Sequence, residues 1–185
     1  PTYALFHGTI GYTVECGENN EASVTMGKYG LIGHTAYVAE NKDDLYLNQL
    51  EFFRRALNNE ESPETEKWFV TQDNQVEANF REKDEYGKFY PEYYVIPTDA
   101  DSQRDIADAY FMQEYFIRNG VQVEKLTEDV TVDGVTYKAG AFVIDMHQIS
   151  RSFANAVLYK GKIVKNWTGL YSESVTNFPE LRGFD

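Results

Sequence analysis

Apolar residues alternate with small or polar ones over residues 8–15, which predicts a strand. One face of such a strand holds Ile10, Tyr12 and Val14, and the opposite face ends in Glu15, because successive strand side chains point to opposite faces. Turn-forming residues follow. We therefore expect Glu15 at the end of a strand, next to a loop, where catalytic carboxylates are often found. An ordinary exposed glutamate gives the same pattern.

Helical spacing of apolar residues begins after Asn41. Leucine and phenylalanine side chains recur at this spacing between residues 45 and 57, which predicts an amphipathic helix over residues 42–58. Asn41 has the residue type of an N-cap, and two aspartates follow it in the first turn. The preceding stretch, residues 26–39, shows no clear period, and its structure is left open.

A polar, acidic stretch interrupted by Pro63 separates this helix from the rest of the chain. Such a composition is typical of a linker or long loop. The sequence therefore predicts a first segment over residues 1–60, a linker or irregular segment over residues 61–89, and a second domain over residues 90–185.

The second domain opens with a short apolar strand over residues 93–96, which Pro97 ends. Ser102 and Asp105 have the spacing of a capping box, and an apolar stripe then predicts a helix that ends at Asn119 and Gly120. Another strand is predicted over residues 121–126. A strand, a helix and a strand joined by short connections favour a parallel crossover and an α/β layer.

Turn chemistry marks the next part of this domain. Asp133 and Gly134 lie between alternating residues, which predicts a tight hairpin over residues 130–137. A strand over residues 141–144 and a helix over residues 150–159 follow. His147 comes directly after the strand; it is either a ligand-binding group at a strand end or a structural histidine.

Composition limits the classes of partner. The chain has 185 residues and a formal net charge of −13, which disfavours nucleic acid and anionic membrane surfaces as partners. No apolar run approaches the roughly 20 residues of a membrane span, so we expect no membrane insertion. The three histidines, His7, His34 and His147, are far apart and show no metal-binding spacing. A phosphate-binding glycine loop and a serine nucleophile elbow are also absent.

The start of the chain gives one further expectation. It opens at Pro1, without an initiator methionine or a signal peptide, and enters a strand-like apolar pattern at Tyr3 to Phe6. We expect it to be a piece of a longer protein.

A family resemblance adds to these patterns. Gly11-Tyr12-Thr13-Val14-Glu15, followed by a loop, a glycine-rich stretch and a helix through Leu57, resembles the last strand and helix of the zinc carboxypeptidases typified by carboxypeptidase A. Residues 137–144, followed by Gln148, Arg151 and a helix, are similar to the appended C-terminal domain of large bacterial members. The resemblance implies a carboxypeptidase-like end followed by a small amidotransferase- or flavodoxin-like α/β domain with a β-hairpin.

The same resemblance implies a role for Glu15. In the family, zinc held by two histidines and a glutamate polarises the scissile carbonyl, while a second carboxylate acts as general base. Glu15 matches that second carboxylate. The zinc ligands and the substrate-binding arginines precede this strand in the family and are absent here, so zinc is expected only in a full-length parent and this chain alone is predicted to be inactive.

The expected partners are the upstream part of the same catalytic domain and, in the parent, a peptide substrate. Extracellular or cell-envelope location in a bacterium is implied by the resemblance alone. A hypothesis of another class stays open, in which the chain is a non-catalytic accessory module that binds peptide or glycan through its aromatic residues.

Overall fold

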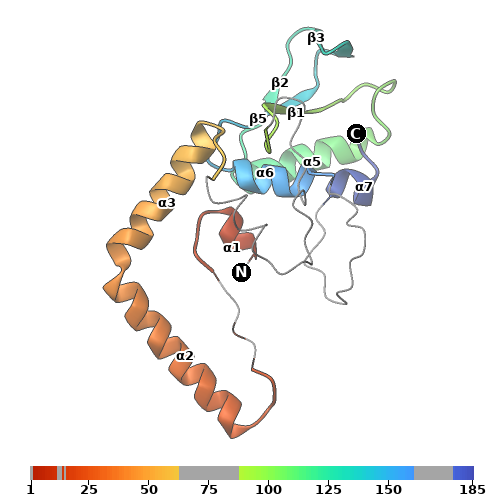
Figure 1. Ribbon diagram of the computed structural model, residues 1–185. Helices are drawn as coiled ribbons and strands as arrows, with labels where there is room; N and C mark the ends of the chain where they lie inside the picture. The colour runs from red at the N-terminus through yellow and green to blue at the C-terminus, as the bar shows by residue number, and fades with distance from the viewer. Residues whose placement is uncertain (1, 12–13, 15, 63–87, 161–176) are drawn as a thin grey trace. The chain divides into compact units, whose positions relative to one another are not determined.

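The computed structural model describes residues 2–11, 14, 16–62, 88–160 and 177–185. The chain divides into two compact units, Pro1–Arg54 and Arg55–Asp185. Helices and small antiparallel sheets both occur, so the chain is of mixed α/β class (Figure 1). The linker predicted over residues 61–89 falls almost wholly outside the described residues.

The described secondary structure of the first unit is helical. Its elements are α1 (Thr2–Phe6), α2 (Glu21–Glu40) and α3 (Lys42–Leu57), whose last turn belongs to the second unit. Helix α2 occupies the stretch left open by the sequence pattern. It begins where the Asn20 side chain accepts a hydrogen bond of 2.9 Å from the Ser23 amide, which is ordinary N-cap chemistry.

Helix α3 starts at Lys42, in agreement with the predicted helix over residues 42–58. The role expected of Asn41 is different. Its side-chain amide donates to the Tyr37 carbonyl at 2.8 Å and so satisfies the C-terminal end of α2. One asparagine thus stands between two consecutive helices, and its side chain serves the first.

The strand predicted over residues 8–15 does not form among its described residues. Residues 9–11 and 14 carry no regular secondary structure, and the strand-like pattern at Tyr3 to Phe6 belongs to helix α1. A strand satisfies its backbone groups only by pairing with a neighbour, and no described residue of the first unit forms a strand. Glu15 lies outside the described residues.

The second unit is built around a three-stranded antiparallel sheet. Its strand order is β1 (Tyr93–Ile96), β5 (Phe142–Asp145) and β2 (Glu124–Lys125). The predicted parallel crossover is present, but its two strands are not neighbours in the sheet. Helix α5 (Ile106–Arg118) does connect β1 to β2, and these two strands run in the same direction, but β5 lies between them and pairs with each in antiparallel fashion. The connection through α5 leaves room for one strand between β1 and β2, and β5 occupies this place.

One face of this sheet carries the core. Phe142 and Ile144 of β5 are buried and alternate with partly exposed residues, as the period of a strand requires. Helix α5 and helix α6 (Arg151–Leu158) lie on that side of the strands, away from the hairpin (Figure 1). Their buried apolar side chains are Ala109, Met112, Phe116, Phe153, Ala154, Val157 and Leu158. Helix α7 (Phe178–Arg182) contacts α6 near the C-terminal residues.

The ends of α5 differ in how well local sequence predicts them. The helix ends at Asn119 as expected, and Gly120 follows with a left-handed φ of 79°. It begins later than the capping-box pattern indicates, because Asp105 is the N-cap and its carboxylate accepts from the Asp108 amide at 2.9 Å. The Ser102 amide instead donates to Asp99 in the preceding turn.

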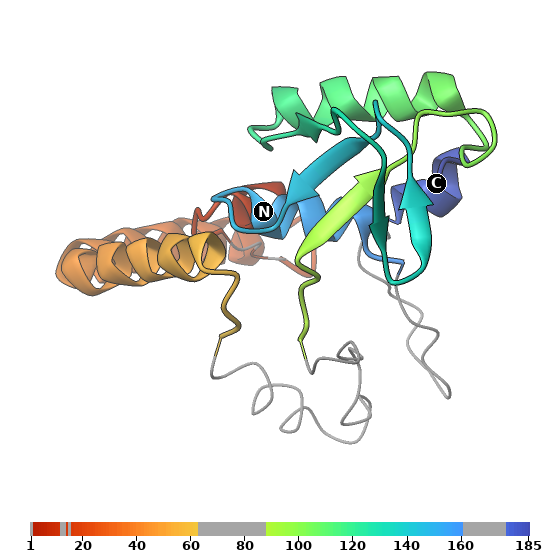
Figure 2. The same cartoon turned by 90° about the horizontal axis from the view of Figure 1, so that it is seen from above.

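The predicted hairpin is confirmed. Strands β3 (Val130–Val132) and β4 (Val135–Tyr137) pair across Asp133 and Gly134, whose φ values of 50° and 79° are both positive, as the tight hairpin turn needs. At its base, the Asp129 carboxylate accepts hydrogen bonds from Lys138 Nζ at 2.8 Å and from the Ala139 amide at 2.9 Å. These contacts lower the pKa of the Asp129 carboxyl, and the hydrogen bond from Lys138 has the largest effect. In Figure 2 the hairpin projects past the three-stranded sheet.

Candidate functional site

The segment that leads to Glu15 is attached to helix α3. Gln49 Nε2 donates to the Gly8 carbonyl at 2.8 Å. Gly8 has a φ of +77°, and a Cβ at this position would stand 2.6 Å from the Phe53 ring. Only glycine fits both the left-handed backbone and this close approach. The chain is therefore held on α3 a few residues before the candidate base, whose own side chain lies outside the described residues.

A cavity of about 710 Å³ lies beside this segment, within the first unit. It is lined mainly by apolar and aromatic groups, with Lys42 and His34 at its margin. The lining residues are Thr9, Ile10, His34, Tyr37, Val38, Lys42, Leu45, Tyr46 and Gln49. No carboxylate is among them, and the mainly apolar walls suit an apolar side chain.

Helix α2 exposes apolar residues on all of its faces. None of its residues is buried, and the exposed fractions reach 73% for Val24 and 71% for Leu31. The other large exposed side chains of this helix are Met26, Tyr29, Ile32, Tyr37 and Val38. A helix that is apolar all round is typical of the interior of a larger structure. Among the described residues, no helix is long and apolar enough to cross a membrane.

The histidine singled out in the second domain is bound by carboxylates. His147 Nδ1 lies 2.9 Å from Asp145 Oδ1, and Nε2 lies 3.5 Å from Glu92 Oε2. The His147 amide also donates to Asp145 at 2.8 Å. Both ring nitrogens therefore face carboxylates at the end of β5. His147 lines neither of the two cavities of this unit described below.

The described residues do not fit a zinc ion. Across residues 2–11, 14, 16–62, 88–160 and 177–185, no three His, Cys, Asp or Glu side chains are placed to hold a metal. The single cysteine, Cys16, is exposed and free.

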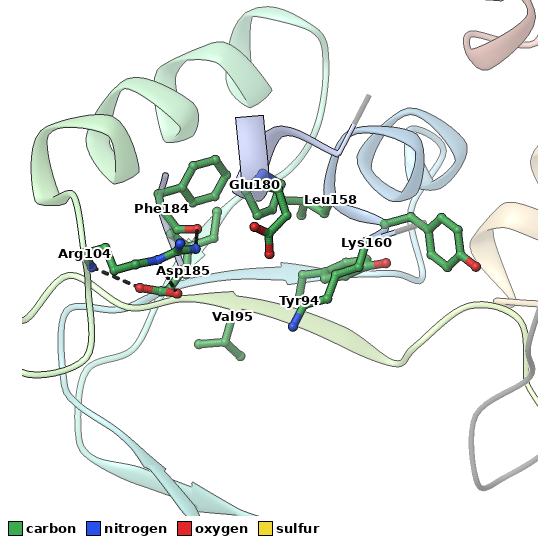
Figure 3. A pocket seen from close by; sticks show the side chains of 11 residues that line it. Tyr94, Val95, Arg104, Leu158, Lys160, Glu180, Phe184 and Asp185 are labelled. Carbon is green, nitrogen blue, oxygen red and sulfur yellow. Dashed lines mark hydrogen bonds and ion pairs between the residues drawn. The ribbon is translucent and has the colours of Figure 1, made fainter. Parts of the chain in front are cut away.

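A first cavity of the second unit, here called the inner hollow, lies on the core side of β1 (Figure 3). Its volume is about 470 Å³, and its walls come from β1, the end of α6, and α7 with the C-terminal residues. Arg104 Nε lies 2.9 Å from Asp185 Oδ1, and its Nη2 donates to the Phe184 carbonyl. These contacts neutralise Arg104. Glu180 directs its carboxylate from α7 toward β1, and Lys160 lies nearby (Figure 3).

A second cavity, here called the outer hollow, lies on the opposite face of the sheet. Its volume is about 680 Å³, and it is bounded by β1, β5 and the β3–β4 hairpin. Its walls are mostly apolar, with Tyr93, Val95 and Val143 from the sheet and Val132 from the hairpin. Two carboxylates, Glu92 and Asp133, stand at its margin.

Sequence reasoning did not find these hollows. The inner hollow joins Arg104 to Asp185, more than 80 positions along the chain. No local spacing links such residues, because the fold alone brings them together. For the outer hollow, the sequence predicted the hairpin that forms one wall. It did not predict that this hairpin lies over the sheet.

The chain was compared with protein families, curated proteins and solved structures. No protein-family model matches the chain, and neither the curated proteins nor the solved structures contain a significant match.

Proposed function

We propose that this chain is the C-terminal part of a bacterial zinc metallocarboxypeptidase, which hydrolyses C-terminal peptide bonds, and that Glu15 supplies its general base. The proposal takes its chemistry from the resemblance of residues 11–15 and of the helix through Leu57. Its structural support is one observation, which is the exposed apolar surface of helix α2.

This surface calls for a covering partner. Burying a single large apolar side chain is worth about 1.5–3 kcal/mol, and α2 leaves seven of them in solvent. Monomeric proteins rarely expose large continuous apolar patches. The upstream part of the same catalytic domain is the partner that the proposal names, since a terminal helix of that domain would pack on it.

The role of Glu15 would be proton transfer. A carboxylate next to the attacked carbonyl can take a proton from water and return it to the departing amine. Zinc, where bound in the parent, would polarise that carbonyl. In this proposal the zinc ligands belong to the upstream part of the parent, and this chain contributes the proton transfers.

The test is Glu15→Gln in the full-length parent. Because glutamine keeps the size and loses the base, kcat should fall about 100- to 10,000-fold, while zinc content and KM stay close to the parent values. Steady-state kinetics on a peptide substrate and metal analysis of the purified protein measure both quantities.

The matched control is Glu18→Gln, a carboxylate three residues along the same segment and exposed to solvent. This variant should keep the parent rate. Full activity of Glu15→Gln, or hydrolysis by the isolated 185-residue chain with bound zinc, would overturn the proposal.

A further inference from the structure

Among the described residues, no strand pairs with the edge of β1 that faces away from β5. We propose that this edge binds an extended peptide in which apolar residues alternate with basic ones, added to the sheet as an additional strand. This proposal concerns Arg55–Asp185 alone and does not depend on the role of Glu15.

The hydrogen-bond pattern shows which backbone groups of β1 are available. The Met146 amide donates to the Glu92 carbonyl at 3.0 Å, and the register pairs Tyr94 with Ile144 and Ile96 with Phe142. Bonded and non-bonded pairs alternate in an antiparallel ladder. The alternate residues, Tyr93 and Val95, therefore direct their N–H and C=O groups away from β5.

The hydrogen bonds between β5 and β2 follow the same alternation. There the Leu126 amide donates to the Ala141 carbonyl at 2.9 Å, so the odd-numbered residues of β5 bond toward β2 and the even-numbered ones toward β1. In the described part of the chain, no strand pairs with the outer edge of β1. An added main chain can meet these donors and acceptors in register.

The two hollows lie on opposite faces of this edge. Val95 of β1 lines both of them. Because side chains on a strand alternate between faces, a peptide paired with β1 would direct one residue toward the inner hollow and the next toward the outer hollow. Main-chain bonds to Tyr93 and Val95 would supply affinity, and the hollows would select side chains.

The chemistry of the hollows defines the peptide. The outer hollow is mostly apolar, which suits aliphatic or aromatic side chains. In the inner hollow, the Glu180 carboxylate points into the cavity and its oxygens accept no hydrogen bond from the described residues. Of the carboxylates that line the hollows, Glu92 pairs with Lys88 and Asp185 with Arg104. This leaves Glu180 and Asp133 against Lys160. This balance favours a cationic peptide.

The probe is a synthetic seven-residue peptide of alternating lysine and valine with blocked ends, titrated into the full 185-residue chain. Amide resonances of Tyr93 and Val95 should shift in a saturable manner in two-dimensional NMR spectra. The same peptide with an N-methyl group on every residue cannot donate to the edge in any register, so it should cause no such shifts. Equal binding of both peptides would overturn the proposal.

Two protein variants locate the contacts. Val95→Pro removes an N–H that does not bond to β5, so it should weaken binding roughly three- to tenfold, the equivalent of one hydrogen bond. Glu180→Gln should weaken binding of the lysine peptide, whereas Glu114→Gln, an exposed carboxylate on α5 that lines neither hollow, should not.

Two further measurements can contradict the proposed site. A peptide of the same composition with its valines grouped at one end should bind more weakly, and equal binding would indicate charge attraction alone. Slow exchange of the Val95 amide in the free protein would show that another segment of the chain already covers this edge.

Discussion

At the residue scale, Arg151 shows how an ordinary-looking basic residue can be a core residue. It is only 4% exposed. Its guanidinium donates to the Glu60 carbonyl at 2.9 Å and to Asn59 Oδ1 at 3.3 Å, and it lies 4.0 Å from the centroid of the Tyr90 ring. Burial lowers the pKa of Arg151, but an arginine remains charged at neutral pH. It joins residues on both sides of the undescribed stretch 63–87.

Arg151→Met should therefore destabilise the second unit. Methionine fills a similar volume but provides no donors, so the Glu60 carbonyl and Asn59 lose their partners, at an expected cost of about 2–4 kcal/mol in the free energy of unfolding. Urea unfolding followed by fluorescence measures this quantity. Arg118→Met, which removes an exposed arginine from the end of α5, is the control and should change stability by less than about 0.5 kcal/mol. Equal effects of the two variants would show that Arg151 is not an anchor.

At the element scale, local chemistry decided some elements and not others. The hairpin was predictable because its turn depends on two adjacent residues, Asp133 and Gly134, whose positive φ values the structure confirms. The strand expected over residues 8–15 could not be predicted reliably from its own residues, because a strand exists only with a partner. Helix α2 escaped the sequence pattern for a related reason: its apolar residues surround the helix, so they give no one-sided period.

Gly134→Ala tests the turn. Gly134 has a φ of +79° and an open environment, so an added methyl group meets no atom and the cost is purely one of backbone conformation. We expect a loss of about 1 kcal/mol in the unfolding free energy. Gly17→Ala, where φ lies outside the left-handed region and space is also open, should be close to neutral. A neutral Gly134→Ala would mean that the turn can rearrange without cost.

At the scale of the whole molecule, the two units differ in how they are stabilised. The second unit has a buried core that includes Met112, Phe116, Ile144 and Phe184. The first unit buries no residue of α2, and Ala56, the only buried residue of α3, belongs to the second unit. Stability follows buried apolar area, so the two units should open independently and at different free energies.

Hydrogen exchange measured by mass spectrometry tests this difference. In the 185-residue chain, amides of α2 should exchange at least about tenfold faster than those of α5 and α6, because no residue of α2 is buried. In a full-length parent, the same amides should gain protection. Equal protection of α2 and α5 in the isolated chain would show that α2 needs no partner and would remove the structural support for the carboxypeptidase proposal.

The sequence by itself determined the features that depend on neighbours along the chain: the hairpin turn, the end of α5, the starts of α3 and α6, and the mixed α/β class. Tertiary structure alone decided which strands pair. It placed β5 between β1 and β2, made the sheet antiparallel, and set Arg104 against Asp185 and Arg151 against Glu60. The physical reason is that pairing and burial depend on contacts between distant residues, which local periodicity does not record. Glu15 remains a prediction from sequence, and the edge of β1 is a site that only the fold reveals.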